Sequence, residues 1–235
     1  SKKKPIIAIK GGITEKGSSA AISHTGTLAG KKEVYFGIFK QTGIIRAESL
    51  EQMFEIASLL EKGVQFNGNK ILVITNGGGY GIISADSISQ SENLSLSELS
   101  KQTSSALRKS LPKNVNIHNP LDLVGDATTE RYKIALETAV KDNSVDAILL
   151  IALYQTPLIT TDIVSIISEA HRETKKPIVV VSTGSEFTEN LSKAVEQNGL
   201  PVFTFPENAV KAIDKVVHYQ RRFKANRQTK SPASR

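Results

Sequence analysis

Short apolar runs alternate with amphipathic segments along most of the chain. Apolar runs bounded by Gly, Pro or polar residues predict buried strands, here at residues 5–9, 43–46, 71–75, 146–153, 177–182 and 200–203. Apolar positions at helical spacing predict helices, here near residues 31–40, 50–62, 80–90, 99–111, 129–141, 162–172, 186–197 and 206–218. Strands alternating with helices indicate right-handed crossovers and a parallel sheet covered on both faces. The fold class expected is α/β with flavodoxin-like topology.

The alternation falls into two blocks joined by a hinge near residues 63–70. Residues 1–66 are too short for a full doubly wound domain, and we interpret them as the C-terminal part of one that begins upstream. Ser49 and Gln52 have capping-box spacing for its last helix, and Gly63 is expected to end that helix. Residues 67–218 contain enough elements for one complete flavodoxin-type domain. We therefore expect one complete domain preceded by part of a second.

Composition narrows the chemistry available. The 235 residues are 39% hydrophobic and include no cysteine, which excludes disulfides, a thiolate nucleophile and a cysteine-built zinc site. We expect no metal site, and any covalent chemistry must use another side chain, with histidine as the leading candidate. The longest apolar runs are too short to span a bilayer and no signal-peptide core follows the lysine-rich start, so we expect no membrane association and a cytoplasmic location.

The net charge of +7 is concentrated at the two ends of the chain. Lys2 to Lys4 carry part of it, and residues 219–235 contain six Lys or Arg and no acidic residue. Without these ends the body is close to neutral, so we expect no nucleic-acid partner. The end from residue 219 is polar and lacks an apolar period, and we expect it to be a basic, disordered tail.

One candidate for covalent chemistry is His24, in a Gly- and Ser-rich stretch (residues 11–30) that follows the first strand. Its small neighbours leave the imidazole accessible, and backbone N–H groups near Thr25 and Gly26 can approach a phosphate. These features suit a nucleophilic histidine. A solvated or capping histidine in a loop is the alternative reading.

A second candidate is the loop Asn76-Gly77-Gly78-Gly79-Tyr80-Gly81, directly after an apolar strand and before a helix. Glycines there allow close backbone approach, and the positive end of the helix dipole attracts anions. The loop is neither a Walker motif nor a clean dinucleotide fingerprint. We predict a phosphate cradle from these residues, with a plain strand-to-helix turn as the alternative.

A third segment spans residues 118–128. Asn119-Pro120 is an ordinary turn signal, and Asp126 or Thr128 can cap the next helix. Asp122 lies between apolar residues, where a buried carboxylate needs a partner such as the backbone N–H groups of a neighbouring loop. We expect Asp122 and Asn119 to support the second loop.

Taken together, these segments resemble the alpha subunits of the archaeal ADP-forming acetate-CoA ligases, which are NDP-forming acyl-CoA synthetases of the succinyl-CoA synthetase superfamily. The resemblance covers roughly residues 4–218. Its motifs occur in the family's order, at residues 4–10, 23–30, 75–81 and 119–127. Four motifs in order are more specific than any one of them.

The resemblance implies a phosphate relay. In the family, an acyl-CoA and phosphate give an acyl phosphate, a histidine takes the phosphoryl group, and phosphohistidine phosphorylates ADP or GDP. The histidine is cradled by two helix N-termini, so His24 is the implied carrier and the loop at residues 76–81 one of the cradles. Asp122 and its neighbours would then form the floor of that cradle.

The family also implies partners. CoA, ADP or ATP, and Mg²⁺ are bound there by other domains: a Rossmann-like CoA-binding domain and an ATP-grasp domain or subunit. In the family, the upstream half of the histidine domain holds the glutamate that pairs with the histidine, and we expect that half to lie outside the 235 residues. We therefore expect a fragment or split subunit of a hetero-oligomer, with no cofactor of its own beyond phosphate on His24.

Two other functions are compatible with the pattern. One is a non-catalytic regulatory or scaffolding module of a synthetase-like protein, although such a module need not keep the histidine. The other is an FMN-binding flavodoxin-like protein with Tyr80 stacked on the flavin, but a second flanking aromatic ring is not apparent.

Overall fold

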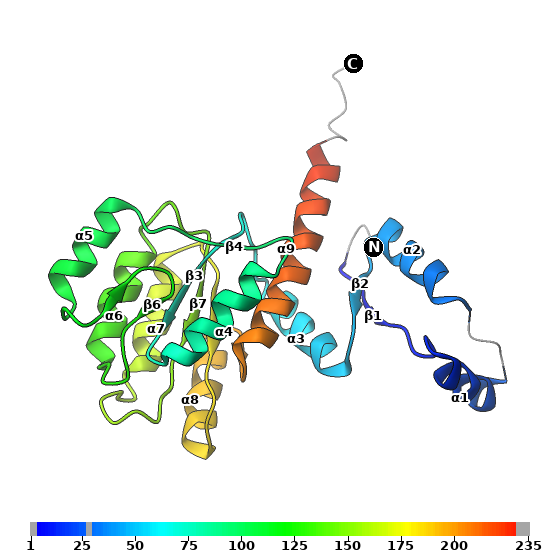
Figure 1. Cartoon of the computed structure of the whole chain (residues 1–235), viewed down its shortest axis with the longest axis horizontal. Coiled ribbons are helices and arrows are strands. Elements are labelled where there is room, and N and C mark those ends of the chain that lie inside the picture. The colour runs from blue at the N-terminus through cyan, green and yellow to red at the C-terminus, as the bar shows by residue number, and fades with distance from the viewer. Residues whose placement is uncertain (1–3, 27–29, 229–235) are drawn as a thin grey trace.

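The computed structural model describes residues 4–26 and 30–228. They form a sheet-and-helix body and an N-terminal arm, residues 4–47, that lies on one side of it (Figure 1). The arm and the helix after it contain β1 (Ile7–Ile9), α1 (Glu15–Thr25), α2 (Lys32–Thr42), β2 (Ile45–Ala47) and α3 (Leu50–Glu61). The body contains β3 (Lys70–Thr75), α4 (Gly78–Ser89), β4 (Ser95–Leu96), α5 (Lys101–Ser110), β5 (Asn116–Ile117), β6 (Leu121–Asp122), α6 (Thr129–Ala139), β7 (Ala147–Ile151), α7 (Ile163–Glu173), β8 (Ile178–Val181), α8 (Glu186–Gln197), β9 (Val202–Phe203) and α9 (Pro206–Gln228).

The body is built on a seven-stranded sheet in the order β5-β6-β3-β7-β8-β9, with β4 also paired to β3. Every pairing is parallel except β5 with β6. The strands β4-β3-β7-β8-β9 follow the flavodoxin-like order, in which the first strand of the domain lies between the second and the third. The expected flavodoxin-like α/β fold is confirmed.

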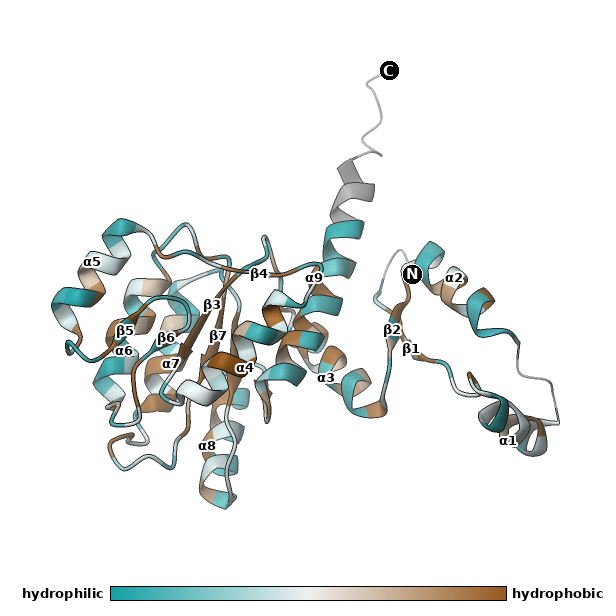
Figure 2. Cartoon of the chain, in the orientation of Figure 1, coloured by the Kyte–Doolittle hydropathy of each residue, from teal (hydrophilic) through white to brown (hydrophobic). Residues whose placement is uncertain are grey.

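Alternate residues of the central strands point to opposite faces of the sheet and pack into two separate hydrophobic cores. Leu72 and Ile74 of β3 join a buried cluster with residues of α5, α6, α7 and α8, while Ile71 and Val73 face α3, α4 and α9. The strands accordingly form an apolar layer between two layers of helices (Figure 2). Full burial of each such side chain contributes about 1.5–3 kcal/mol to the stability of the fold. No helix in the described part of the chain has the length and apolar character needed to cross a bilayer.

Helix α3 belongs to the body's core, although it precedes the expected domain boundary at residue 66. Its Ile56 and Leu59 are fully buried in the cluster shared with α9. The predicted ends of this helix are confirmed: Ser49 Oγ accepts a hydrogen bond from the Gln52 N–H at 3.1 Å, and Gly63 has a left-handed φ of 67°. The arm before α3 is thus tied to the body through a helix that is itself firmly packed.

The Gly- and Ser-rich stretch in the arm is partly helical, so the expected loop is wrong for residues 15–25. Thr14 caps α1 by accepting a hydrogen bond from the Gly17 N–H at 3.1 Å. Gly26 ends the helix with a φ of 69° and donates its N–H to the Ile22 carbonyl. A good cap at each end compensates for a sequence of small residues with weak apolar periodicity.

Helix α9 continues to Gln228, whereas we expected it to end near residue 218 and a disordered tail to follow. Gln220 explains part of the difference. Its side chain is only 6% exposed, accepts a hydrogen bond from the Phe66 N–H at 2.8 Å and donates one to the Val64 carbonyl at 2.7 Å. These bonds fix the helix to the hinge segment beyond its expected end. The expected tail from residue 229 onward lies outside the described residues.

Candidate functional site

The N-terminus of α4 opens at the carboxyl end of the central strand β3. Helix α4 begins at Gly78, two residues earlier than expected, and Gly77 caps it without a side-chain hydrogen bond. The Gly81 N–H donates to the Gly77 carbonyl at 3.1 Å. The N–H groups of Gly78, Gly79 and Tyr80 have no hydrogen-bond partner within residues 4–26 and 30–228. Free N–H groups at the positive end of a helix are donors that an anion can accept from, so the α4 turn is a candidate anion site.

Close packing explains two of the glycines in this turn. A Cβ on Gly77 would lie 2.7 Å from Leu153 Cδ1, and one on Gly78 would lie 2.9 Å from Asp122 Oδ2. A Cβ on Gly79 would meet no atom within 4 Å. Gly79 therefore faces open space, and its N–H is accessible to a ligand.

Asn76 connects this turn to the next strand of the sheet. Its Oδ1 accepts a hydrogen bond from the Leu153 N–H at 3.0 Å, and its Nδ2 donates to Thr156 Oγ1 at 3.1 Å. The residue is 3% exposed. Since both ends of the amide are engaged by the loop after β7, the Asn76 side chain positions the turn and only the backbone beyond it faces a ligand.

Asn119 supports the same strand from its other side. Its Oδ1 accepts from the Val73 N–H at 3.0 Å, and its Nδ2 donates to the carbonyls of Ile71 at 2.7 Å and Ser97 at 3.0 Å. These bonds fill the gap on the edge of β3 between β4 and β6, which pair with opposite ends of that strand. The peptide bond from Asn119 to Pro120 is cis.

Asp122 lies at the floor of the α4 turn. Its Oδ1 accepts a hydrogen bond from the Val124 N–H at 2.9 Å, and its Oδ2 faces Gly78. The expected backbone partner is present, although it comes from the loop of Asp122 itself. Val124 has a φ of 63°, unusual for a β-branched residue, so the loop is held in a strained shape beside the anion site.

Arg131 holds this loop in place, and the sequence did not single it out. Its Nη1 donates to the Leu123 carbonyl at 3.0 Å and to Asp126 Oδ1 at 2.7 Å. The hydrogen bond from Arg131 lowers the pKa of the exposed Asp126 carboxyl. Asp126 and Thr128 were the two expected caps of α6. Thr128 is the N-cap, because its Oγ1 accepts a hydrogen bond from the Arg131 N–H at 3.3 Å.

Two tyrosines lie beneath the site in the apolar core. The Tyr132 hydroxyl donates to the Ile151 carbonyl at 2.7 Å, whereas the Tyr154 hydroxyl has no partner among the described residues. Burial raises the pKa of both hydroxyls, so both stay neutral. They form an apolar base for the turn rather than a source of protons.

His24 lies in the last turn of α1 and is exposed. Figure 1 shows α1 at the far end of the arm, well apart from α4. The structure therefore does not bring His24 together with the α4 turn. Gly26 is the C-terminal cap of α1, and the side chain of Thr25 lies outside the described residues.

Metal binding has no evident place in the described part of the chain. No group of three or more His, Asp or Glu side chains lies close enough there to hold an ion. The α4 turn offers N–H donors, which suit an anion. Such donors are compatible with a phosphate or a carboxylate.

Two family models match the chain. Residues 71–227 match a Ligase-CoA domain, and residues 1–60 match a succinyl-CoA ligase like flavodoxin domain. Both matches agree with the family resemblance that the motifs indicate.

Curated relatives and solved structures point the same way. The chain is 40% identical over 223 residues to an ADP-forming acetate–CoA ligase of Methanocaldococcus jannaschii, covering 93% of this chain and 32% of that protein. It is 33% identical to the alpha subunit of ADP-forming acetate–CoA ligase II of Pyrococcus furiosus, covering 90% of this chain and 47% of the subunit. A solved structure of the dinucleotide-forming acetyl-coenzyme A synthetase 1 of Ca. Korarchaeum cryptofilum, in complex with phosphate and ADP, matches with a TM-score of 0.86 and 29% identity over 99% of this chain and 50% of its own. The chain thus spans between about a third and a half of these relatives.

Proposed function

Because the chain belongs to the Ligase-CoA domain family, we propose that it performs the phosphate-relay step of an NDP-forming acyl-CoA synthetase, with His24 as the phosphate carrier. The overall reaction converts acetyl-CoA or another acyl-CoA, ADP and phosphate into the acid, CoA and ATP, and it is reversible. The observation that carries the proposal is the open N-terminus of α4, where the N–H groups of Gly78, Gly79 and Tyr80 are free within the described residues.

The relay consists of two phosphoryl transfers. In the first, an unprotonated imidazole nitrogen of His24 attacks the phosphorus of an acyl phosphate, the N–P bond forms, and the P–O bond to the acyl group breaks to release the carboxylate. In the second, an oxygen of the terminal phosphate of ADP attacks the same phosphorus, and the N–P bond breaks to return neutral imidazole. The α4 N–H groups stabilise the charge on the transferring group at each stage.

The proposal requires α1 to approach α4. Glycines with left-handed φ flank α1 at both ends, 66° at Gly12 and 69° at Gly26. Such positions absorb large changes of backbone direction at little steric cost. We propose that α1 moves about these glycines and carries His24 to the α4 turn.

The partners follow from the same reading. We propose that a Rossmann-like domain binds CoA and that an ATP-grasp domain or subunit binds ADP or ATP with Mg²⁺, in a cytoplasmic hetero-oligomer. The match to a protein named as an alpha subunit, of which this chain covers 47%, supports a need for further domains.

The other two functions have less support. Tyr80, which was the expected flavin-stacking ring, packs against the core cluster shared by α4 and α9. For a scaffolding module, free N–H groups at a helix start are expected in any case, and what counts against it is the histidine motif at residues 23–30, which such a module need not keep.

Phosphorylation by a small donor tests the proposal. We expect ³²P-labelled acetyl phosphate to give an acid-labile, base-stable label on the chain, because phosphoramidates hydrolyse in acid. His24→Asn should abolish the label, and His118→Asn should keep it, since His118 is also exposed but lies outside the arm. An acid-labile label that persists in His24→Asn, or a wild-type chain that takes no label, contradicts the proposal.

A further inference from the structure

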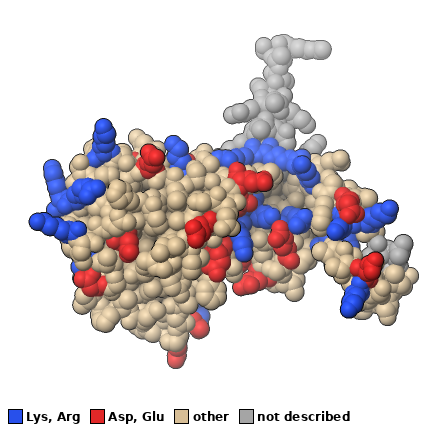
Figure 3. Space-filling model, in the orientation of Figure 1, with Lys and Arg blue, Asp and Glu red and all other residues tan. Residues whose placement is uncertain are grey.

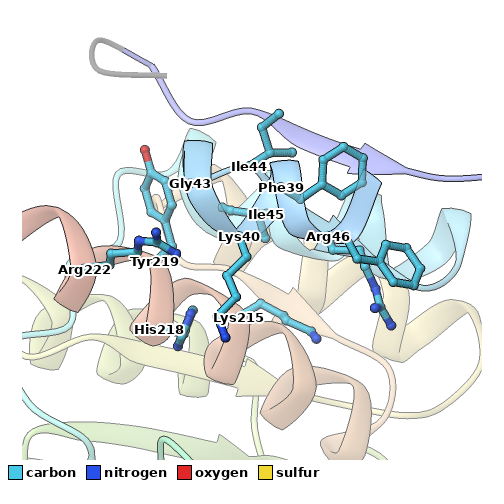
Figure 4. Close-up of a pocket in the computed structure, with 11 residues that line it drawn as sticks. Phe39, Lys40, Gly43, Ile44, Ile45, Arg46, Lys215, His218, Tyr219 and Arg222 are labelled. Atoms are coloured by element: carbon cyan, nitrogen blue, oxygen red, sulfur yellow. The ribbon is translucent and has the colours of Figure 1, made fainter. Parts of the chain in front are cut away.

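A cleft separates the arm from the C-terminal half of α9, on elements other than those that form the α4 turn (Figure 4). Its volume is about 380 Å³, within the usual range for small-molecule sites. Side chains from α2, β2 and α9 line it. They are Phe36, Phe39, Lys40, Gly43, Ile44, Ile45, Arg46, Lys215, His218, Tyr219 and Arg222.

The cleft is strongly basic. Lys40, Arg46, Lys215 and Arg222 line it, and none of the lining residues is acidic. In Figure 4, the Lys40 side chain points from α2 toward Lys215 and His218 on α9. Lys and Arg also gather at the base of the projecting α9 in the surface view (Figure 3). Cations that converge across a cleft repel one another and concentrate anions there.

A nearby acidic residue neutralises only part of the positive charge of the cleft. Glu48, whose side chain is 58% exposed, contacts Arg46 at 3.3 Å and Lys215 at 3.4 Å. One carboxylate thus serves two cations. Lys40 and Arg222 form no ion pair with an acidic residue in the part of the chain that the structure describes. The cleft retains an excess positive charge that a phosphate group would balance.

The walls of the cleft suit a ligand that is only partly charged. Phe36, Phe39 and the side chains of Ile44 and Ile45 line the arm side. The Arg46 guanidinium lies over the Phe36 ring, 4.0 Å from its centroid, which fixes both groups before a ligand arrives. Apolar and aromatic walls beside free cations favour an anion that carries a planar ring.

We propose that this cleft binds a nucleoside phosphate, with the phosphates at Lys40, Lys215 and Arg222 and the base against the aromatic and aliphatic wall. The site is separate from the α4 turn and does not depend on a phosphohistidine. Because its two walls come from the arm and from α9, a bound ligand stabilises the arm in its position against the body. The site thereby links nucleotide binding to the position of α2 and β2 against α9.

Titration calorimetry with ADP, adenosine and inorganic phosphate on the full chain tests the proposal. ADP should bind, while adenosine lacks the charge and phosphate lacks the ring, so each should bind at least about tenfold more weakly. The double variant Lys40→Gln/Arg222→Gln should weaken ADP binding about tenfold or more. The matched control Arg108→Gln/Lys109→Gln removes the same charge from an exposed part of α5 and should leave ADP binding unchanged.

A third variant separates the two anion sites. Gly79→Asp places a carboxylate at the α4 turn and should not change ADP binding in the cleft. The proposal is overturned if Gly79→Asp weakens ADP binding while Lys40→Gln/Arg222→Gln does not, since ADP then occupies the α4 turn. It is also overturned if ADP does not bind, if inorganic phosphate binds as tightly as ADP, or if the α5 control loses as much affinity as the cleft variant.

Discussion

Gly79→Asp separates the anion site from the stability of the helix that forms it. Residue 79 is the second residue of α4, and a Cβ there meets no atom within 4 Å, so the substitution fits without movement of the backbone. An aspartate in a first turn interacts favourably with the helix dipole and replaces a glycine inside the helix. We expect the free energy of unfolding to rise by about 0.5–1 kcal/mol.

The carboxylate of Gly79→Asp should repel a phosphoryl group bound at the α4 turn. Two unit charges about 4 Å apart repel by about 4 kcal/mol at an effective dielectric of about 20. If the phosphoryl group of the relay is held by the free N–H groups of the turn, transfer should slow by about a thousandfold. The protein should then become more stable and less active from one substitution.

The assay measures phosphorylation of His24 by acetyl phosphate beside urea unfolding of the same samples. Gly79→Asn is the matched control, because asparagine has nearly the size of aspartate and no charge. Its labelling rate should stay within about tenfold of wild type if charge is the cause. Added salt should partly restore the rate of Gly79→Asp, since ions screen an exposed charge.

Two results would refute this reasoning. Equal losses in Gly79→Asn and Gly79→Asp would show that the side chain blocks access by size and that charge at the turn is irrelevant. Normal labelling in Gly79→Asp, with increased stability, would show that the α4 N-terminus is a structural turn and does not contact the phosphoryl group.

Three further predictions concern the stability of the body and use urea unfolding. Asn119→Ala should lower the free energy of unfolding by about 2–4 kcal/mol, because it leaves backbone groups on the edge of β3 without partners. Burial of Asp142 opposes its ionisation, but hydrogen bonds from nearby backbone and hydroxyl groups prevail and lower its pKa to about 2. Its contribution of about 2 kcal/mol should thus be present above pH ~4 and decline as the pH falls toward 2, and Asp142→Asn should flatten that slope. Tyr132→Phe should cost about 1–2 kcal/mol, whereas Tyr154→Phe should be neutral within about 0.5 kcal/mol, since only the first hydroxyl has a partner among the described residues.

The sequence predicted the body of the fold well because its elements are strongly periodic. Helix α8 lies at the predicted residues 186–197, and the three longest strands agree with the apolar runs. The strands β4, β5 and β6 were missed because each has two residues and lies outside the apolar runs, whereas the equally short β9 lies within one. Helix α1 was missed because its stability comes from Thr14 and Gly26 at its ends and not from an apolar face.

The sequence predicted the position of the candidate site but not the contacts that shape it. Glycines after a strand predicted the location of the turn, since that signal is local. The contacts that shape it are not local: Leu153, which holds Asn76, is 77 residues farther along the chain. No pattern near either residue indicates such a pairing. Arg131 was overlooked for the same reason, as its role depends on a loop conformation that only the folded chain displays.

The α4 turn and the helix α1, the two parts of the proposed relay, differ in how many contacts hold them to the body. Asn76 ties the α4 turn to the loop after β7, and Asn119 holds β3, the strand that leads into the turn. The helix with His24 is flanked by two glycines in left-handed conformation and stands apart from the body. A preorganised anion site loses least when it is rigid, whereas a carrier that serves two transfers must move between them. A rigid α4 turn and a mobile α1 are thus what a carrier that moves between two sites needs.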